Sequence, residues 1–108
     1  MREHMEKGKK FEFGQVVEYQ NEGIVSSRVL ENKVGGITVF AFDEGQRLSE
    51  HSAPFDAVIT VLEGQGEIVI GGKSNRLLAG ESIIMPANIP HAVNAVARFK
   101  MMLIMIKG

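Results

Sequence analysis

Short apolar segments rich in Val, Ile and Phe recur along the chain, and turn residues separate them. Segments of this length and composition predict β-strands. No run of ten or more residues carries a helical stripe, since Ser26, Ser27 and the Val34-Gly35-Gly36 break interrupt the one candidate. About nine or ten short strands at regular spacing predict an all-β barrel or two-sheet roll. The predicted strands are 16–19, 24–30, 37–42, 55–62, 67–70, 76–78, 81–85, 91–97 and 99–106.

Glycines mark the predicted reversals between these strands. The segment Glu63-Gly64-Gln65-Gly66 predicts a tight turn, because glycine adopts positive φ angles without steric cost. Gly71-Gly72, between Ile70 and Lys73, predicts a two-residue hairpin.

Length and composition favour a single domain. The chain has 108 residues, of which 44% are hydrophobic and 23% charged, which suffices to bury a core without covalent staples. Residues 1–10 are mostly charged and lack periodicity. We therefore expect a flexible lead-in over residues 1–10 and one barrel domain over residues 11–108.

The balance of charges argues against two classes of partner. Twelve basic and thirteen acidic side chains give a formal net charge of −1, so neither nucleic acid nor an anionic membrane is expected to bind. Cysteine is absent, which removes disulfides and thiolate sites. The N-terminus lacks a signal-peptide core, and no run approaches the roughly 18 apolar residues of a membrane span. The expected location is cytoplasmic.

Known catalytic motifs are also missing from the sequence. There is no nucleophile elbow or Ser/His/Asp arrangement, and the glycine pairs are too isolated to form a phosphate-binding loop. Hydrolase and nucleotide-binding functions therefore have no support.

Two histidines are the strongest candidates for chemistry. His51 ends the segment Gly45-QRLSE-His51, and His91 ends the segment Gly80-ESIIM-Pro86-ANIP-His91. Each lies at the mouth of a predicted strand, so a small barrel would allow the two imidazoles to meet. Imidazole is the commonest transition-metal ligand and titrates near neutral pH. His4, in the charged lead-in, is predicted to be solvated.

The spacing around these histidines resembles that of the cupin family. The family is marked by G-x5-H-x-H-x3,4-E-x6-G and then G-x5-P-x-G-x2-H-x3-N. This chain has Gly45-x5-His51 with a later Gly64, and Gly80-x5-Pro86-x-Asn88-x2-His91. The segment VLEGQGEIVIGG between them is also similar to the family's linker, and the resemblance covers roughly residues 37–106. It implies a small single-domain jelly-roll barrel, the double-stranded β-helix, often paired as a homodimer.

The resemblance also implies a metal site, of which this chain keeps two ligands. In cupins, three histidines and one glutamate hold a divalent ion inside the barrel. His51 and His91 match two of the histidines, whereas the other histidine position is Ala53. The glutamate position is Ala57, or Val58 with the longer spacing. Asn88 and Ala95 replace two further residues of the second motif, its glycine and its asparagine.

Asp56 and Met85 are secondary candidates. Asp56 is the nearest carboxylate that could act as a third metal ligand, although it alternates in direction with Ala57 on a continuous strand. The alternative role for Asp56 is that of a rim carboxylate with local backbone hydrogen bonds. Met85 is predicted to line a ligand pocket, or else to fill the core like most methionines.

The last predicted strand indicates that the chain pairs with a second copy of itself. The segment Phe99-KMMLIMI is apolar on both faces, as expected when one face meets the barrel interior and the other meets a second sheet. We therefore expect a homodimer.

Three functions compete on this basis. The first is a barrel that binds a small molecule between His51 and His91. The second is a metal-dependent oxygenase or isomerase using Fe, Mn, Ni or Zn as a Lewis acid. The third is a structural domain whose pocket has no ligand. Small-molecule binding is the expected function.

Overall fold

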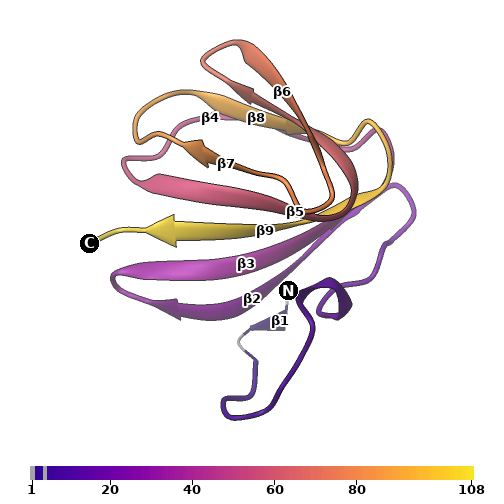
Figure 1. Cartoon of the computed structure of the whole chain (residues 1–108), viewed down its shortest axis with the longest axis vertical. Coiled ribbons are helices and arrows are strands. Elements are labelled where there is room, and N and C mark those ends of the chain that lie inside the picture. Colours follow the sequence, from indigo (N-terminus) through magenta and orange to yellow (C-terminus); the bar gives the residue numbers. More distant parts are fainter. Residues whose placement is uncertain (1, 4) are drawn as a thin grey trace.

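Strand β5 (Asp56–Ile70) is the centre of the fold, because its two halves belong to different sheets (Figure 1). The computed structural model describes residues 2–3 and 5–108. In the first sheet, the first half of β5 pairs with β9 (Phe99–Ile106) and with β7 (Ser82–Met85). In the second sheet, the other half of β5 pairs with β6 (Lys73–Leu78) and with β8 (His91–Asn94).

The remaining strands extend these two sheets outward. In the first sheet, β9 pairs with β3 (Gly35–Phe42), β3 with β2 (Ile24–Asn32), and β2 with β1 (Arg2–Glu3). In the second sheet, β8 pairs with β4 (Arg47–His51). The sheets curl toward each other, and the architecture is the double-stranded β-helix that the resemblance implies. The all-β prediction is confirmed.

The predicted reversal at Glu63–Gly66 is wrong, because β5 runs through it without a turn. Gly64 has φ +75° and directly follows the irregularity between Val61 and Glu63 in the pairing of β5 with β9. A Cβ at Gly64 would lie 2.1 Å from the carbonyl oxygen of Arg98, and a Cβ at Gly66 would lie 2.6 Å from the Phe99 ring. These glycines allow close approach where the strand changes sheets, a use that the sequence pattern does not distinguish from a turn.

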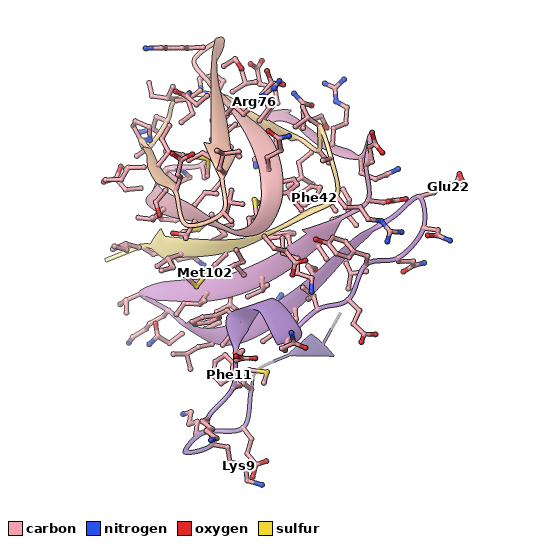
Figure 2. All side chains as sticks on the ribbon, turned by 45° about the vertical axis from the view of Figure 1, so that its right-hand side comes forward. Lys9, Phe11, Glu22, Phe42, Arg76 and Met102 are labelled. Carbon is pink, nitrogen blue, oxygen red and sulfur yellow. The ribbon has the colours of Figure 1, made fainter. Side chains whose placement is uncertain are left out.

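Side chains alternate between the two faces of each strand, and those on the inner faces form the core between the sheets. Phe42 and Phe99 stack with ring centroids 4.7 Å apart, and both are fully buried. Side chains crowd the space between the sheets (Figure 2). The buried members of this interior cluster are Phe42, Ala57, Ile59, Val61, Ile68, Leu77, Met85, Val93, Ala95, Phe99 and Met101.

A second apolar cluster lies on the outer face of the first sheet. Val16 and Val17 pack there against Val29, Val39 and Ala41. The prediction of a strand over 16–19 is wrong: the 3₁₀ helix η1 (Phe13–Gln15) precedes these residues, and no strand forms there. The apolar side chains of the two valines cover the outer face of this sheet.

The lead-in also lies against this sheet. Strand β1 pairs in parallel with β2, and the amide of Met5 donates a 2.9 Å hydrogen bond to the carbonyl of Val29. Lys9 and Phe11 lie on a loop that extends from the barrel (Figure 2). The flexibility expected of residues 1–10 stays a prediction.

Hairpin and strand-end predictions had mixed outcomes. The Gly71-Gly72 hairpin is confirmed, with Ile70 paired to Lys73 and φ angles of 56° and 82°. Strand β8 ends at Asn94 instead of residue 97. Strand β4 was not predicted, because its sequence RLSEH is mostly polar, and its residues are mostly exposed. Within residues 2–3 and 5–108, no helix is long and apolar enough to cross a bilayer.

Candidate functional site

The two histidines of the sequence motifs lie side by side in the second sheet. His51 is the last residue of β4, His91 is the first residue of β8, and the two are directly paired. A bulge between Leu48 and His51 adjusts the register of β4. His91 also pairs with Ile70 of β5, and Val93, two residues further along β8, belongs to the interior cluster. Because alternate residues share a face, His91 points into the barrel.

The imidazole rings meet through their Nε2 atoms. His51 Nε2 and His91 Nε2 lie 3.2 Å apart, and the ring planes cross at 68° with centroids 4.4 Å apart. His91 is 7% exposed, whereas His51 is exposed to solvent. The pair therefore spans from the interior of the barrel to its surface.

Backbone carbonyl oxygens contact Nδ1 of both rings. His51 Nδ1 lies 2.9 Å from the carbonyl oxygen of Ser49, and His91 Nδ1 lies 3.2 Å from that of Ile89. A carbonyl oxygen only accepts, so each Nδ1 carries the proton that it donates. In the neutral rings both Nε2 atoms then present lone pairs to the same point. Two such lone pairs repel unless a proton, a hydrogen-bond donor or a metal ion lies between them.

The environment of His91 favours its neutral form. Burial lowers its pKa from the ordinary value of 6.5, and the nearby His51 adds to this effect. The hydrogen bond to Ile89 acts in the opposite direction. His91 is therefore neutral near pH 7, with the Nε2 lone pair available to a ligand.

The positions that hold the other ligands in cupins are apolar here. Ala57 is 3% exposed and lies between Met85 and Met105 in the register of the first sheet. Ala53 is half-buried, and its carbonyl accepts a 2.7 Å hydrogen bond from the amide of Asn88, which has φ 68°. Neither alanine side chain can bind a metal.

The structure does not bring Asp56 to the histidine pair. Asp56 is exposed, lies on the face of β5 opposite Ala57, and accepts a 2.8 Å hydrogen bond from the amide of Ala87. Among the side chains described, from residue 5 onward, no three His, Asp or Glu side chains gather closely enough to hold a metal. His4 lies outside the described residues. Asp56 thus has the local backbone contact of a rim carboxylate.

Met85 faces the barrel interior beside Ala57. It is 5% exposed and belongs to the interior cluster. A cavity of about 70 Å³ lies on the same inner face, where Met105 also pairs with Gly36 of β3. The residues that line this cavity are Glu31, Gly36, Thr38, Leu103, Met105 and Lys107. The role of Met85 in ligand binding stays a prediction.

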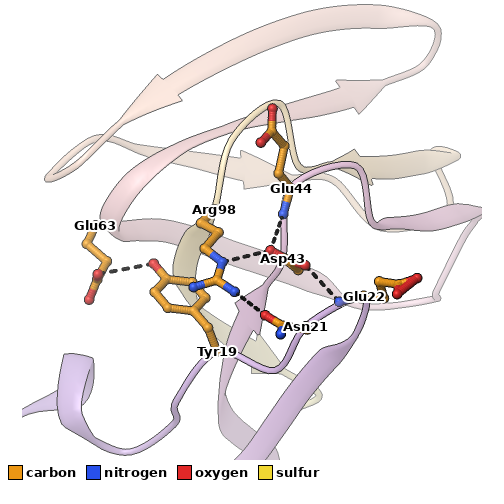
Figure 3. A network of polar contacts seen from close by, with 7 residues as sticks. All are labelled: Tyr19, Asn21, Glu22, Asp43, Glu44, Glu63 and Arg98. Carbon is orange, nitrogen blue, oxygen red and sulfur yellow. Dashed lines mark hydrogen bonds and ion pairs between the residues drawn. The ribbon is translucent and has the colours of Figure 1, made fainter.

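A polar network that the sequence did not suggest fastens the N-terminal segment to the barrel (Figure 3). Arg98 donates 2.7 Å hydrogen bonds to Asp43 and to Asn21, and the Tyr19 hydroxyl donates one of 3.1 Å to Glu63. The Arg98 hydrogen bond holds the pKa of Asp43 down at about 2. The sequence feature that points to this network is the pair of basic residues beside Phe99, Arg98 and Lys100, in an otherwise apolar segment.

Lys100 adds a buried cation beside this network. Its Nζ donates a 2.6 Å hydrogen bond to the carbonyl of Gly14, lies 3.3 Å from Glu63 Oε1, and sits 5.1 Å from the centre of the Tyr19 ring. Lys100 is 7% exposed and points to the outer face of the first sheet, away from the histidines. Its role is to hold the N-terminal segment.

The sequence profile of the cupin domain family matches residues 38–107. Among solved structures, a conserved protein of unknown function from Streptococcus pyogenes is 38% identical, with a TM-score of 0.91 over 97% of this chain and 92% of the other. A cupin 2 conserved barrel domain protein from Leptotrichia buccalis is 44% identical, with a TM-score of 0.88 over 90% of this chain. This chain corresponds to 47% of the Leptotrichia protein.

More distant structures share the fold alone. A salicylate 1,2-dioxygenase from Pseudoaminobacter salicylatoxidans is 17% identical, with a TM-score of 0.73 over 80% of this chain and 27% of that enzyme. No curated protein matches the sequence.

Proposed function

The chain belongs to the cupin family, and from this premise we propose that it binds a small organic ligand at His51 and His91. The observation that supports this proposal is the 3.2 Å approach of the two Nε2 atoms, with each Nδ1 beside a backbone carbonyl oxygen. The matching partner is a group that donates a hydrogen bond, such as a hydroxyl, a protonated acid or an acidic N–H.

The surroundings of the pair favour a ligand with an apolar body. Ala57, Met85 and Met105 form an apolar row on the inner face of the first sheet, and sites of this kind bind through a few polar groups in an apolar wall.

Metal-dependent catalysis is the second candidate, and one observation favours it. Metal-bound histidines donate their other ring N–H to a carbonyl or carboxylate, as both rings do here. The two Nε2 atoms, 3.2 Å apart, would be the protein atoms that hold such an ion. The four-ligand cupin site nevertheless does not fit this chain, since Ala53 and Ala57 supply no donor. Any Fe, Mn, Ni or Zn ion would depend on water or ligand oxygens for the remaining positions.

Native mass spectrometry combined with elemental analysis tests the two candidates. The protein is purified without chelator and measured before and after reconstitution with Fe(II), Mn(II), Ni(II) or Zn(II). Small-molecule binding predicts a bound organic species, or thermal stabilisation by small hydroxy or carboxylic acids, without stoichiometric metal. The His51→Ala and His91→Ala variants should lose this binding, whereas His4→Ala, which changes the third histidine, should keep it.

The outcomes separate the two candidates. One equivalent of metal that is lost in both histidine variants would favour the metal-dependent function over the metal-free one. Organic binding that survives in both variants would overturn the role of the histidine pair.

A further inference from the structure

The loop between β7 and β8, residues 86–90, carries the carbonyl group that contacts the ring of His91. Nδ1 of His91 lies 3.2 Å from the carbonyl oxygen of Ile89, near the end of this loop. The orientation of the ring therefore depends on where the loop holds Ile89. How firmly the loop is held follows from the partners of its backbone N–H and C=O groups.

The sequence of the loop accounts for its turn. Pro86 and Pro90 have no N–H, so the backbone donors of the loop are Ala87, Asn88 and Ile89. The Ile89 amide donates a 3.4 Å hydrogen bond to the carbonyl of Pro86, and Asn88 has φ 68°. A positive φ at the third residue of a four-residue turn is the pattern of a type II turn, which favours glycine or asparagine there. The asparagine that replaces the glycine of the cupin motif therefore suits this turn.

The other two donors attach the loop to the segment between β4 and β5. The amide of Asn88 donates a 2.7 Å hydrogen bond to the carbonyl of Ala53, and the amide of Ala87 donates one of 2.8 Å to Oδ1 of Asp56. Among the acceptors of the loop amides, Asp56 alone supplies a side chain. These two bonds join the loop before β8 to the region after β4, and each of these strands carries one of the two histidines.

Asp56 takes this role because the ladder of β5 and β7 stops at Pro86 (Figure 1). Ala57 pairs with Met85, so the next positions in the antiparallel register are Asp56 and Pro86. Proline cannot donate a ladder hydrogen bond. The carboxylate of Asp56 instead accepts from the following amide, that of Ala87, and a charged acceptor makes a stronger hydrogen bond than a neutral one.

The far end of the loop has a separate anchor. The amide of Gly71 donates a 2.8 Å hydrogen bond to the carbonyl of Pro90. A Cβ at Gly71 would lie 3.4 Å from the side chain of Ile89, so the hairpin between β5 and β6 packs against the loop. The near end of the loop, after β7, depends on the bonds to Asp56 and Ala53.

We propose that Asp56 is a positioning residue for the histidine pair, because it holds the loop whose Ile89 carbonyl keeps the proton of His91 on Nδ1. With the proton there, Nε2 of His91 presents its lone pair toward Nε2 of His51, 3.2 Å away. Without the carbonyl in place, the Nε2–H form becomes favourable, since it donates to His51 instead of opposing its lone pair. The inference rests on the proposed function, in which the ligand uses the lone pair at Nε2.

Nitrogen-15 NMR of the histidine rings tests this role in the ligand-free protein, so the outcome does not depend on whether the chain binds a small molecule. The wild-type His91 ring should be in the Nδ1–H form at a pH well above its ordinary pKa of 6.5. Asp56→Ala removes the acceptor, and its His91 ring should lose the single form and populate Nε2–H as well. Asp56→Asn keeps an acceptor oxygen and should retain the wild-type spectrum.

Glu67→Ala is the matched control for the loss of a carboxylate from β5. Glu67 accepts hydrogen bonds from Ser74 and Asn94 of the neighbouring strands, and none of these residues belongs to the 86–90 loop. This variant should therefore leave the spectrum of His91 unchanged. Because Glu67 and Asp56 are both little buried, an unchanged circular-dichroism spectrum is expected for all the variants.

Amide hydrogen exchange at Ala87 shows whether the bond to Asp56 is broken, and it should rise in Asp56→Ala but not in Glu67→Ala. If Ala87 exchanges faster in Asp56→Ala while the His91 ring keeps the wild-type form, the proposal is wrong. It is equally wrong if Asp56→Asn changes the ring as Asp56→Ala does, or if Glu67→Ala changes it to the same extent.

Discussion

Lys100 of β9 and Gly14 of the 3₁₀ helix are joined by a 2.6 Å hydrogen bond between residues 86 positions apart in the sequence. A buried lysine is costly unless each of its contacts is satisfied. Here the ammonium group has a carbonyl, the carboxylate of Glu63 and the face of the Tyr19 ring. The N-terminal segment thus completes the surroundings of a charge that the barrel already carries.

Replacing this lysine should loosen the N-terminal segment before it affects the barrel. The Lys100→Met variant keeps most of the apolar stem but removes the donor to Gly14, and we expect a loss of about 1–3 kcal/mol in the free energy of unfolding. Hydrogen exchange should rise over residues 13–19 and remain unchanged in β5. Lys107→Met is the control, because Lys107 is exposed. Equal exchange over 13–19 in the two variants would contradict this role of Lys100.

Tyr19 is the only tyrosine of a chain without tryptophan, so its ionisation can be followed by ultraviolet absorbance. Burial, followed by the hydrogen bond and the negative charge of Glu63, raises its pKa from 10.0 to about 12. Because the folded-state pKa is the higher one, the stabilising contribution is complete below pH 10 and is lost as the pH rises toward 12. The Glu63→Gln variant should titrate at lower pH than the wild type. A wild-type midpoint near the ordinary value would refute this description of the network.

Two glycines with similar φ angles should respond differently to alanine. Gly64 has φ +75° and Gly72 has φ +82°, but only at Gly64 would a Cβ meet backbone, 2.1 Å from the Arg98 carbonyl oxygen. Gly72→Ala should cost about 1 kcal/mol from backbone strain alone, and Gly64→Ala about 3 kcal/mol or more. Urea unfolding of both variants measures the difference. Equal costs would mean that β5 does not need close approach at this point.

Restoring the cupin ligands should create a metal site at the expense of stability. In the Ala57→Glu variant, a carboxylate replaces a methyl group between Met85 and Met105, which should cost several kcal/mol in the metal-free protein. Adding Ala53→His and then Zn(II) or Mn(II) should recover part of this loss, because binding to the folded state stabilises it. Calorimetry and thermal unfolding with and without metal provide the measurement. Val58→Glu, on the other face of β5, should gain no such response.

The sequence predicts the strands correctly where apolar residues alternate. It fails where the same residue type is compatible with two different local structures. The Gly71-Gly72 hairpin was correct because a glycine pair between paired strands has one common use. The sequence predicts a turn at Gly64 and Gly66, whereas in the structure these glycines allow β5 to pack closely against Phe99. The sequence predicts a strand at Val16 and Val17, because residues that cover the outside of a sheet are apolar in the same way as residues within a strand.

For the site, the sequence predicts that His51 and His91 could meet in a small barrel, and the structure pairs them on adjacent strands. It did not predict the contacts of both Nδ1 atoms, because these depend on the path of the backbone at Ser49 and Ile89. The cluster around Lys100 was also not predicted, since its three partners, Gly14, Tyr19 and Glu63, are far from it in the sequence.

The continuity of β5 has a mechanical consequence. Val58 pairs with Ile84 in the first sheet, and Ile70 pairs with His91 at the far end of the same strand. One continuous backbone therefore joins the first sheet to the residue that pairs with His91 in the second. A change in the path of β5 would therefore alter the strand pairing of both sheets.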